Sequence, residues 1–122
     1  MSAREKISPN FFLDEFECSC SCGFNDINMD LVERIQRVRD SVGPIGISSA
    51  CRCETWNQEC GGKINSAHTK GLALDVVCGN SRERYKLLMA LLLEFDRIGI
   101  SSDGFIHVDT DASRDENVCW TY

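Results

Sequence analysis

The sequence predicts an α+β domain, because helical and strand-like patterns occupy separate stretches of a chain of one domain's length. Apolar residues recur with helical spacing over residues 29–42, and residues 81–95 are apolar enough and long enough for a second helix. Short β-like runs lie between and after these two segments. At 122 residues, we expect residues 1–122 to form one domain with one modest core.

The N-terminal third predicts a short helix, a loop and a longer helix. Ser8-Pro9 ahead of residues 10–16 is typical of a capped helix with proline at an early position. The stretch from Cys18 to Gly23 is too rich in cysteine, serine and glycine for regular structure, so we expect a loop. The helix over residues 29–42 is amphipathic, and Gly43-Pro44 ends it.

The remainder of the chain predicts short strands around one further long helix. The helix over residues 81–95 is apolar on nearly all sides, so we expect it to be buried. Two runs flank the turn Ser102-Asp103-Gly104 and predict a pair of antiparallel strands. The expected elements are, in order, a strand at 45–49, a short helix at 54–60, a strand at 72–77, the helix at 81–95, and strands at 97–101 and 105–110.

The overall charge argues against a general nucleic-acid-binding role. The chain has 19 acidic and 13 basic residues, a formal charge of -6, which repels a polyanion. No apolar run approaches the roughly 18 residues of a membrane span. The N-terminus lacks the apolar segment of a secretory signal, so we expect a protein made in the cytoplasm.

Two histidines and one aspartate lie in segments that suggest a metal site. Asp75 sits within the apolar run Leu72 to Val77, where its charge needs compensation. His68 precedes it by seven residues, and His107 lies in a second apolar strand. Catalytic zinc takes three ligands of these types and leaves one position for water. The pattern therefore predicts a zinc site at His68, Asp75 and His107; the alternative is ordinary hydrogen bonding.

The residues around these ligands form a longer ordered pattern. Residues 66–75 read S-x-H-x-x-G-x-A-x-D and resemble the zinc-site signature of the D-alanyl-D-alanine carboxypeptidase family, the M15 type of cell-wall peptidases. Four further landmarks are similar to those of that family: Ser49-Ala50-Cys51-Arg52, then Asn57 and Gly61-Gly62, then Phe105 to Asp109, and Trp120-Thr121-Tyr122.

The resemblance implies a small, mainly antiparallel sheet with packed helices, as in hedgehog and DD-peptidase folds. It implies zinc at the same three ligands, a substrate-carboxylate clamp at Arg52, and Ser66 beside the substrate. A guanidinium suits the clamp because it grips a carboxylate with two N–H groups. The implied substrate is a peptidoglycan stem peptide, cut by a carboxypeptidase or an endopeptidase acting as a monomer. Without a signal peptide, such an enzyme fits an endolysin of a phage or prophage.

The general base is the point at which the sequence departs from the family. The family commonly has Glu or Asp three residues before the last histidine, where this chain has Gly104. Asp103 is the nearest acid and reaches the site only if the chain bends inward at Asp103-Gly104, which glycine favours. Asp109 is the other candidate, as base or as a residue that orients a ligand. A non-catalytic, zinc-stabilised binding module is therefore the alternative function.

Eight cysteines lack zinc-finger spacing. Three states stay open, in order of preference: free or partly oxidised thiols, disulfides between the 18–22 loop and Cys51 or Cys53, and a structural thiolate metal site. A C-x-x-C redox motif does not occur.

Overall fold

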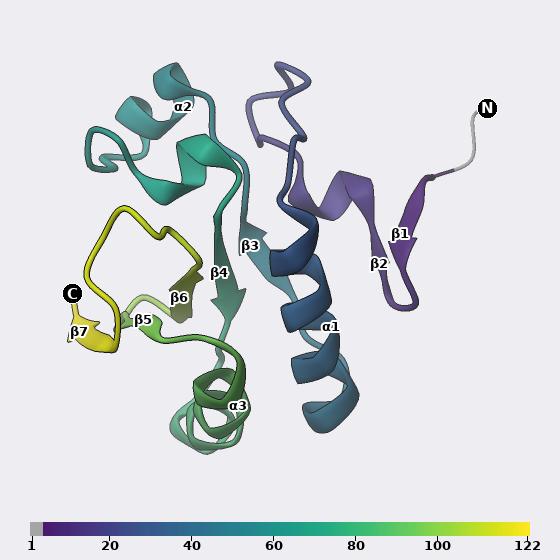
Figure 1. Ribbon diagram of the computed structural model, residues 1–122, viewed down its shortest axis with the longest axis vertical. Helices are drawn as coiled ribbons and strands as arrows, with labels where there is room; N and C mark the ends of the chain where they lie inside the picture. The colour runs from purple at the N-terminus through teal and green to yellow at the C-terminus, as the bar shows by residue number, and fades with distance from the viewer. Residues whose placement is uncertain (1–3) are drawn as a thin grey trace.

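The centre of the fold is a five-stranded sheet built from β3 (Ile47–Ser49), β4 (Ala73–Val77), β5 (Arg97–Ile100), β6 (Phe105–Asp109) and β7 (Val118–Thr121). The strand order is β3-β4-β6-β5-β7 in this computed structural model, which describes residues 4–122 (Figure 1). All neighbouring strands are antiparallel except β5 and β7. The predicted α+β class with a mainly antiparallel sheet is therefore confirmed.

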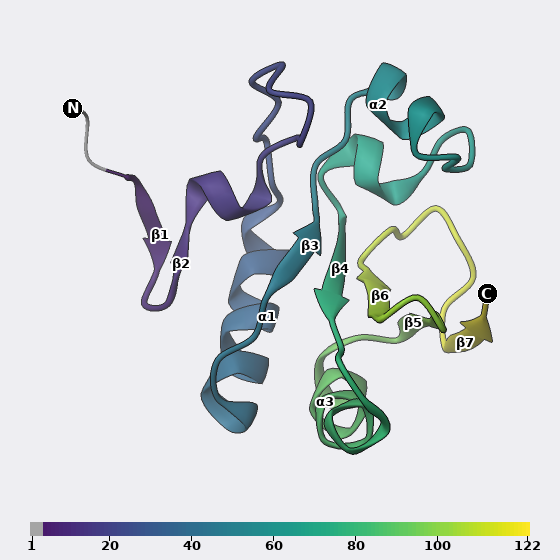
Figure 2. The same ribbon diagram turned by 180° about the vertical axis from the view of Figure 1, so that it is seen from behind.

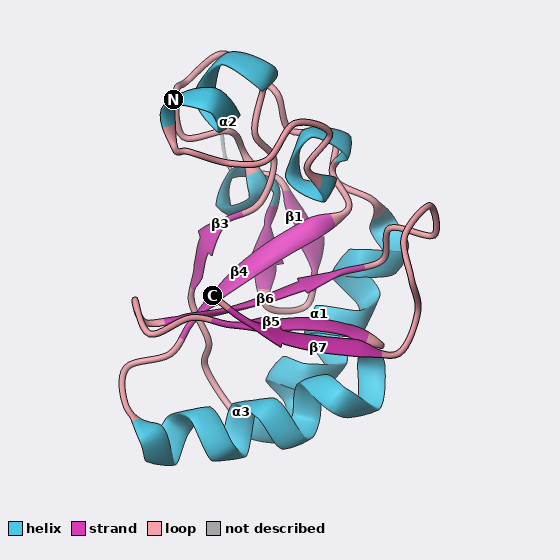
Figure 3. Ribbon diagram, turned by 90° about the vertical axis from the view of Figure 1, so that its left-hand side faces the viewer, coloured by secondary structure: helices cyan, strands magenta, loops and turns pink. Residues whose placement is uncertain are grey.

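Two long helices, α1 (Met29–Val42) and α3 (Ser81–Glu94), cover one face of the sheet and leave the other open (Figure 3). Each begins at an asparagine whose side chain accepts a backbone N–H: Asn28 from Leu31 and Asn80 from Glu83. Apolar side chains from both helices and the central strands share one core: Leu31, Val32, Ile35, Val38, Leu87, Leu91, Leu74, Val76, Ile98, Ile106 and Val108.

The smaller elements lie around the edges of the sheet. A short hairpin of β1 (Lys6–Ser8) and β2 (Phe11–Phe12) leads into the 3-10 helix η1 (Leu13–Phe16). Helix α2 (Glu54–Glu59) and the 3-10 helix η2 (Ala67–Lys70) lie together at one end of the sheet, as Figure 2 also shows from behind. Among residues 4–122, none of the helices has the length and apolar character of a membrane span.

Two predictions about helices are wrong. Residues 10–16 do not form one helix, because Pro9 and Asn10 make the turn of the hairpin and only residues 13–16 are helical. The helix predicted at 81–95 exists but is not buried all round. Its outer face leaves large apolar side chains in solvent, because α1 and the sheet cover only one side; these are Tyr85, Met89, Leu92 and Leu93.

The alternation of β4 and β6 decides what the open face carries. Leu74 and Val76 point into the core, so Asp75 between them points to the opposite face. The same alternation in β6 places His107 and Asp109 on that face. The register pairs Asp75 directly with His107 across the two strands. The sheet thus brings residues 32 positions apart in the sequence into contact.

Candidate metal centre

A cavity of about 570 Å³ opens on this face of the sheet and contains every site residue predicted from the sequence. The three predicted metal ligands line its floor, and all three are buried. The other predicted site residues, Arg52, Ser66, Asp103 and Asp109, line the same cavity. The fold therefore assembles one site from four separate segments of the chain.

The two predicted histidine ligands converge on one oxygen atom of the third ligand, Asp75. Oδ1 of Asp75 lies 3.2 Å from Nε2 of His68 and 3.0 Å from Nδ1 of His107. Burial alone would raise the pKa of Asp75, but the hydrogen bonds from His107 and His68 outweigh burial and hold that pKa well below its usual range. Asp75 is therefore a carboxylate at neutral pH.

The outer nitrogens of both imidazoles are already bonded. Nδ1 of His68 lies 2.7 Å from the carbonyl oxygen of Ala50, which can only accept, so this nitrogen carries a proton. Nε2 of His107 lies 2.8 Å from Oδ2 of Asp109 and donates to it. In the neutral imidazoles, the inner nitrogens would then both present lone pairs to the Asp75 carboxylate. Only a cation, either protons or a metal ion, makes this arrangement favourable.

The donor set fits zinc. Two imidazole nitrogens and one carboxylate oxygen are the ligands of many catalytic zinc sites, and a tetrahedron with bonds of 2.0–2.1 Å separates its ligand atoms by about 3.3 Å. In the structure, Oδ1 of Asp75 lies 3.0 and 3.2 Å from the two imidazole nitrogens, and all three ligand atoms lie within 4.8 Å of one another. The outer hydrogen bonds of His68 and His107 are those that hold ligating histidines in one tautomer.

Asp109 is a partner of His107 rather than a free acid. Besides His107, it accepts from Nε of Arg97 at 2.7 Å and from the backbone N–H of Asp111 at 3.1 Å, and it is only 2% exposed. Burial raises its pKa, but His107 and Arg97 outweigh burial and lower it. In turn, burial lowers the pKa of His107, while the carboxylates of Asp109 and Asp75 outweigh burial and raise it.

Arg52 joins the same network from the segment ahead of α2. Its Nη2 donates to Oδ2 of Asp75 at 3.0 Å, its Nε to Oγ of Ser49 at 2.9 Å, and its Nη1 to Oδ1 of Asn57 at 3.2 Å. A guanidinium has five N–H groups, so one remains on each Nη. Arg52 thus anchors the Asp75 carboxylate and keeps two donors for a second anion. The contact with Asp75 was not predicted.

The motif residues near Arg52 hold it in place. A Cβ atom at Gly62 would lie 2.1 Å from Oδ1 of Asn57, so only glycine allows this approach. Nδ2 of Asn57 also donates to the carbonyl oxygen of Lys63 at 2.9 Å, which orients its Oδ1 toward Arg52. The asparagine and glycine landmarks therefore position the guanidinium.

Ser66 has a local structural contact. Its Oγ accepts the backbone N–H of His68 at 3.2 Å and caps η2, the element that presents His68. Gly71 ends η2 with φ +69°, and a Cβ there would lie 2.1 Å from the carbonyl oxygen of Asp26. The serine and glycine of the signature thus fix the turn that carries the first histidine.

Asp103 is exposed at the wall of the cavity, in the turn between β5 and β6. Gly104 has φ +89°, a left-handed conformation that few other residues adopt without strain. The chain therefore does turn at Asp103-Gly104, and the turn leaves the Asp103 carboxylate without burial or a buried partner.

Sequence reasoning did not predict the roles of Arg97, which lines the cavity, or of Asp111, whose backbone N–H bonds to Asp109 beside it. Arg97 pairs with Asp109, and its guanidinium carbon lies 5.2 Å from the ring centre of Trp120. Asp111 is 3% exposed and binds Lys70 and Arg114, each at 3.1 Å. A charged residue at the start of an apolar strand was the available signal for Arg97, but its partner depends on strand register.

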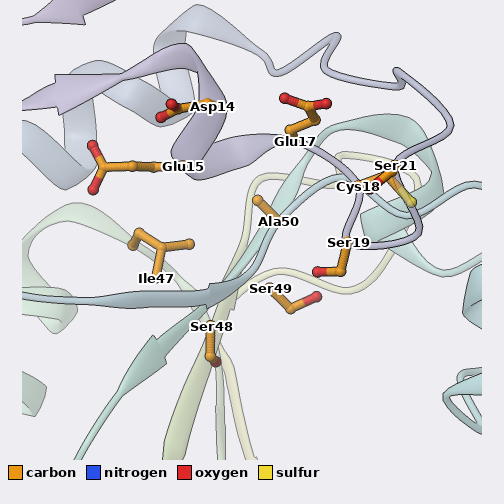
Figure 4. A pocket seen from close by; sticks show the side chains of 10 residues that line it. All are labelled: Asp14, Glu15, Glu17, Cys18, Ser19, Ser21, Ile47, Ser48, Ser49 and Ala50. Carbon is orange, nitrogen blue, oxygen red and sulfur yellow. The ribbon is translucent and has the colours of Figure 1, made fainter. Parts of the chain in front are cut away.

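A second cavity, of about 520 Å³, is bordered by η1, residues 17–21 and β3 (Figure 4). Its acidic side chains are Asp14, Glu15 and Glu17. Asp14 pairs with Arg4 at 2.7 Å, and Glu15 accepts the backbone N–H of Phe12 at 2.7 Å. These partners account for two of the three acids, and none of the three predicted metal ligands borders this cavity.

The cysteines are all free thiols, and four of them gather at one place: Cys18, Cys20, Cys22 and Cys53. Burial raises the pKa of Cys18, but the backbone N–H groups of Cys53 and Cys20 and the neighbouring thiols outweigh burial and lower it to about 7. Cys51 instead packs in the core, where burial raises its pKa to about 12. No disulfide between the loop and Cys51 or Cys53 is present among the described residues.

Comparison with known families agrees with the site. A model of the Peptidase M15 family matches residues 9–109, which include the three converging ligands, Arg52 and Asp109. A search of curated proteins finds no significant match. Because the family match covers most of the chain and contains the buried His-Asp-His group, this chain belongs to the Peptidase M15 family.

Proposed function

We propose that this protein is a zinc-dependent peptidase that hydrolyses a peptide bond in peptidoglycan stem peptides, as a D-Ala-D-Ala carboxypeptidase or an endolysin-type endopeptidase. Membership of the M15 family implies a metallopeptidase and a peptide substrate. The observation that carries the proposal is the convergence of His68, Asp75 and His107 beside a guanidinium that keeps two unused N–H groups, all in one cavity.

The residues of the chain divide the work. A zinc ion bound at the three ligands would supply a Lewis acid for the scissile carbonyl and for water. Arg52 binds a carboxylate of the substrate through its two remaining N–H groups. Asp103 takes a proton from the attacking water and returns it to the amine that leaves as the C–N bond breaks. Asp109 accepts a hydrogen bond from Nε2 of His107 and so keeps the proton on that nitrogen. The lone pair of Nδ1 then faces Asp75 and the metal position.

A zinc-stabilised binding module is the second candidate, and one observation favours it. Gly104 occupies the position where the family commonly has its acid, and Asp103 is exposed rather than held against the triad. A module of this kind would keep the metal and the Arg52 clamp but would release no product.

Digestion of purified peptidoglycan, followed by mass spectrometry of the soluble products and metal analysis of the protein, tests the proposal. We expect about one zinc ion at the triad and release of D-alanine or of shorter stem peptides, abolished by a chelator and by His107→Ala. D-Alanine alone indicates a carboxypeptidase, and cleaved cross-links indicate an endopeptidase. Zinc binding without any product would support the binding module, and normal cleavage by His107→Ala would refute the proposed ligands.

A further inference from the structure

The four-cysteine cluster lies outside the cavity of the proposed active site. Cys18, Cys20 and Cys22 belong to a stretch of twelve residues between η1 and α1 that has no helix or strand. Cys53 comes from a distant part of the sequence, the N-cap of α2. Figures 1 and 2 both show this loop beside the connection from β3 to α2, and Figure 4 shows Cys18 and Ser19 lining the same cavity as the end of β3.

The sulfur atoms are spaced for a shared ion rather than for bonds to one another. Sγ of Cys20 lies 3.4 Å from that of Cys18 and 3.6 Å from that of Cys53, and all four sulfurs lie within 4.8 Å of one another. Tetrahedral zinc with Zn–S bonds of 2.3 Å separates its sulfurs by about 3.8 Å. A disulfide, by contrast, requires sulfurs about 2.05 Å apart.

Backbone groups around the sulfurs suit thiolate ligands. The N–H of Cys53 points to Sγ of Cys18, and the N–H of Trp56 points to Sγ of Cys53, both at 3.4 Å. Donors of this kind stabilise metal-bound thiolates. The loop is also bent to bring its cysteines together, because Ser21 has φ +66° and Gly23 has φ +93°. This connection is longer than most in a compact domain, and a shared metal ion would hold it in one conformation.

We propose that Cys18, Cys20, Cys22 and Cys53 bind a second, structural metal ion of the soft thiolate-preferring class, with Zn²⁺ the expected occupant. Four thiolates fill a tetrahedral zinc site and leave no open position, so this ion has no catalytic role. It cross-links the N-terminal segment to the residue that follows Arg52. The backbone of this region is already held by two hydrogen bonds, from Cys51 to Phe16 at 3.1 Å and from Arg52 to His68 at 3.0 Å.

The proposed cysteine site therefore holds Cys53, the next residue after Arg52, and so helps to keep Arg52 in position. Loss of the metal frees the loop and residue 53 together, which we expect to raise amide hydrogen exchange in residues 17–28 and at Cys53. This proposal does not depend on peptidase activity, because it concerns metal content and spectroscopy alone.

The test is metal analysis of the full chain, purified under reducing conditions, with two variants and one control. Wild type is expected to hold about two zinc ions, and His68→Ala/His107→Ala about one. Cys20→Ser/Cys22→Ser, whose replaced side chains are exposed, is expected to lose about one ion. The control Cys60→Ser/Cys119→Ser changes two exposed cysteines outside the cluster and keeps wild-type metal content.

Cobalt substitution identifies the ligands even if the histidine variant does not fold. Wild type loaded with Co²⁺ is expected to show the intense near-ultraviolet absorption of thiolate-to-cobalt charge transfer, and Cys20→Ser/Cys22→Ser is expected to lose it. Absence of this band in wild type, or full metal content in Cys20→Ser/Cys22→Ser, would overturn the proposal. An intact mass lower by the hydrogens lost in disulfide formation, with no metal, would also overturn it.

Discussion

Replacing Asp109 with Asn tests how the site fixes the tautomer of His107. Oδ1 of Asp109 accepts from Arg97 and from the N–H of Asp111, while Oδ2 accepts from Nε2 of His107 at 2.8 Å. In the variant, the amide oxygen keeps the two donors, so its NH₂ group faces His107. Two N–H groups cannot bond to each other, and the His107 proton therefore moves from Nε2 to Nδ1.

Nδ1 of His107 is the atom that faces Asp75 and the expected metal. A proton on Nδ1 removes the lone pair that a metal needs. Zinc binding then carries the free-energy cost of moving that proton back to Nε2. Loss of such an outer partner weakens metal affinity about 10- to 100-fold, which corresponds to about 1.4–2.7 kcal/mol.

Competition with a chromophoric zinc chelator measures this affinity, and circular dichroism checks that Asp109→Asn folds. Asp103→Asn is the matched control, because it makes the same chemical change at an exposed residue of the same cavity. Its zinc affinity is expected to equal that of wild type. A wild-type zinc affinity in folded Asp109→Asn would show that Asp109 does not orient a ligand.

Three further predictions follow from the contacts of the site. Lysine at position 52 cannot reproduce the three directed N–H bonds of Arg52, so Arg52→Lys is expected to lower kcat/KM at least about tenfold and to weaken zinc binding somewhat through Asp75. Unchanged kcat/KM and zinc affinity would show that Arg52 has no role in the site. Asp103→Asn is expected to lower kcat about 10²- to 10⁴-fold at normal zinc content, and a small effect would exclude it as the base. Asp111→Asn is expected to cost about 1–3 kcal/mol of unfolding free energy at pH 7, measured with urea, because Lys70 and Arg114 lose the buried anionic acceptor that pairs with both. Burial raises the pKa of Asp111, but hydrogen bonds from Ser113, Lys70 and Arg114 outweigh burial and lower this pKa. The Asp111 carboxylate therefore stabilises the fold fully above the unfolded-state pKa of about 4, and this contribution is lost as the pH falls below that value. The difference between variant and wild type should therefore shrink in acid, and a constant difference would contradict this role.

The fold could be predicted where the signal was local. Helical spacing located α1 to the residue, and the turn at 102–104 gave the β5–β6 pair. Hydrophobicity alone could not show that α3 exposes one side, because Leu92 and Leu93 look like core residues until the neighbours of the helix are known. The hairpin at Pro9 was missed for a similar reason, since the same proline suits a helix start and a turn.

The candidate site was predictable as residue types but not as contacts. The spacing around His68 and the apolar setting of Asp75 marked both as unusual. The structure places Nε2 of His68 3.2 Å from Oδ1 of Asp75. The bonds of Arg52 to Asp75 and of Arg97 to Asp109 depend on strand register and on the path of the α2 segment. The cysteine cluster depends on the fold in the same way, because Cys53 joins it from outside the loop.

Anomalous diffraction at the zinc absorption edge, from crystals of the zinc-loaded protein, would locate the metal ion and its ligands. We expect a peak about 2.0–2.2 Å from Nε2 of His68, Nδ1 of His107 and Oδ1 of Asp75, the usual length of zinc bonds to nitrogen and oxygen. A peak bonded to Nε2 of His107, or a triad without any peak in crystals of protein that cleaves stem peptides, would show that these three atoms are not the zinc ligands.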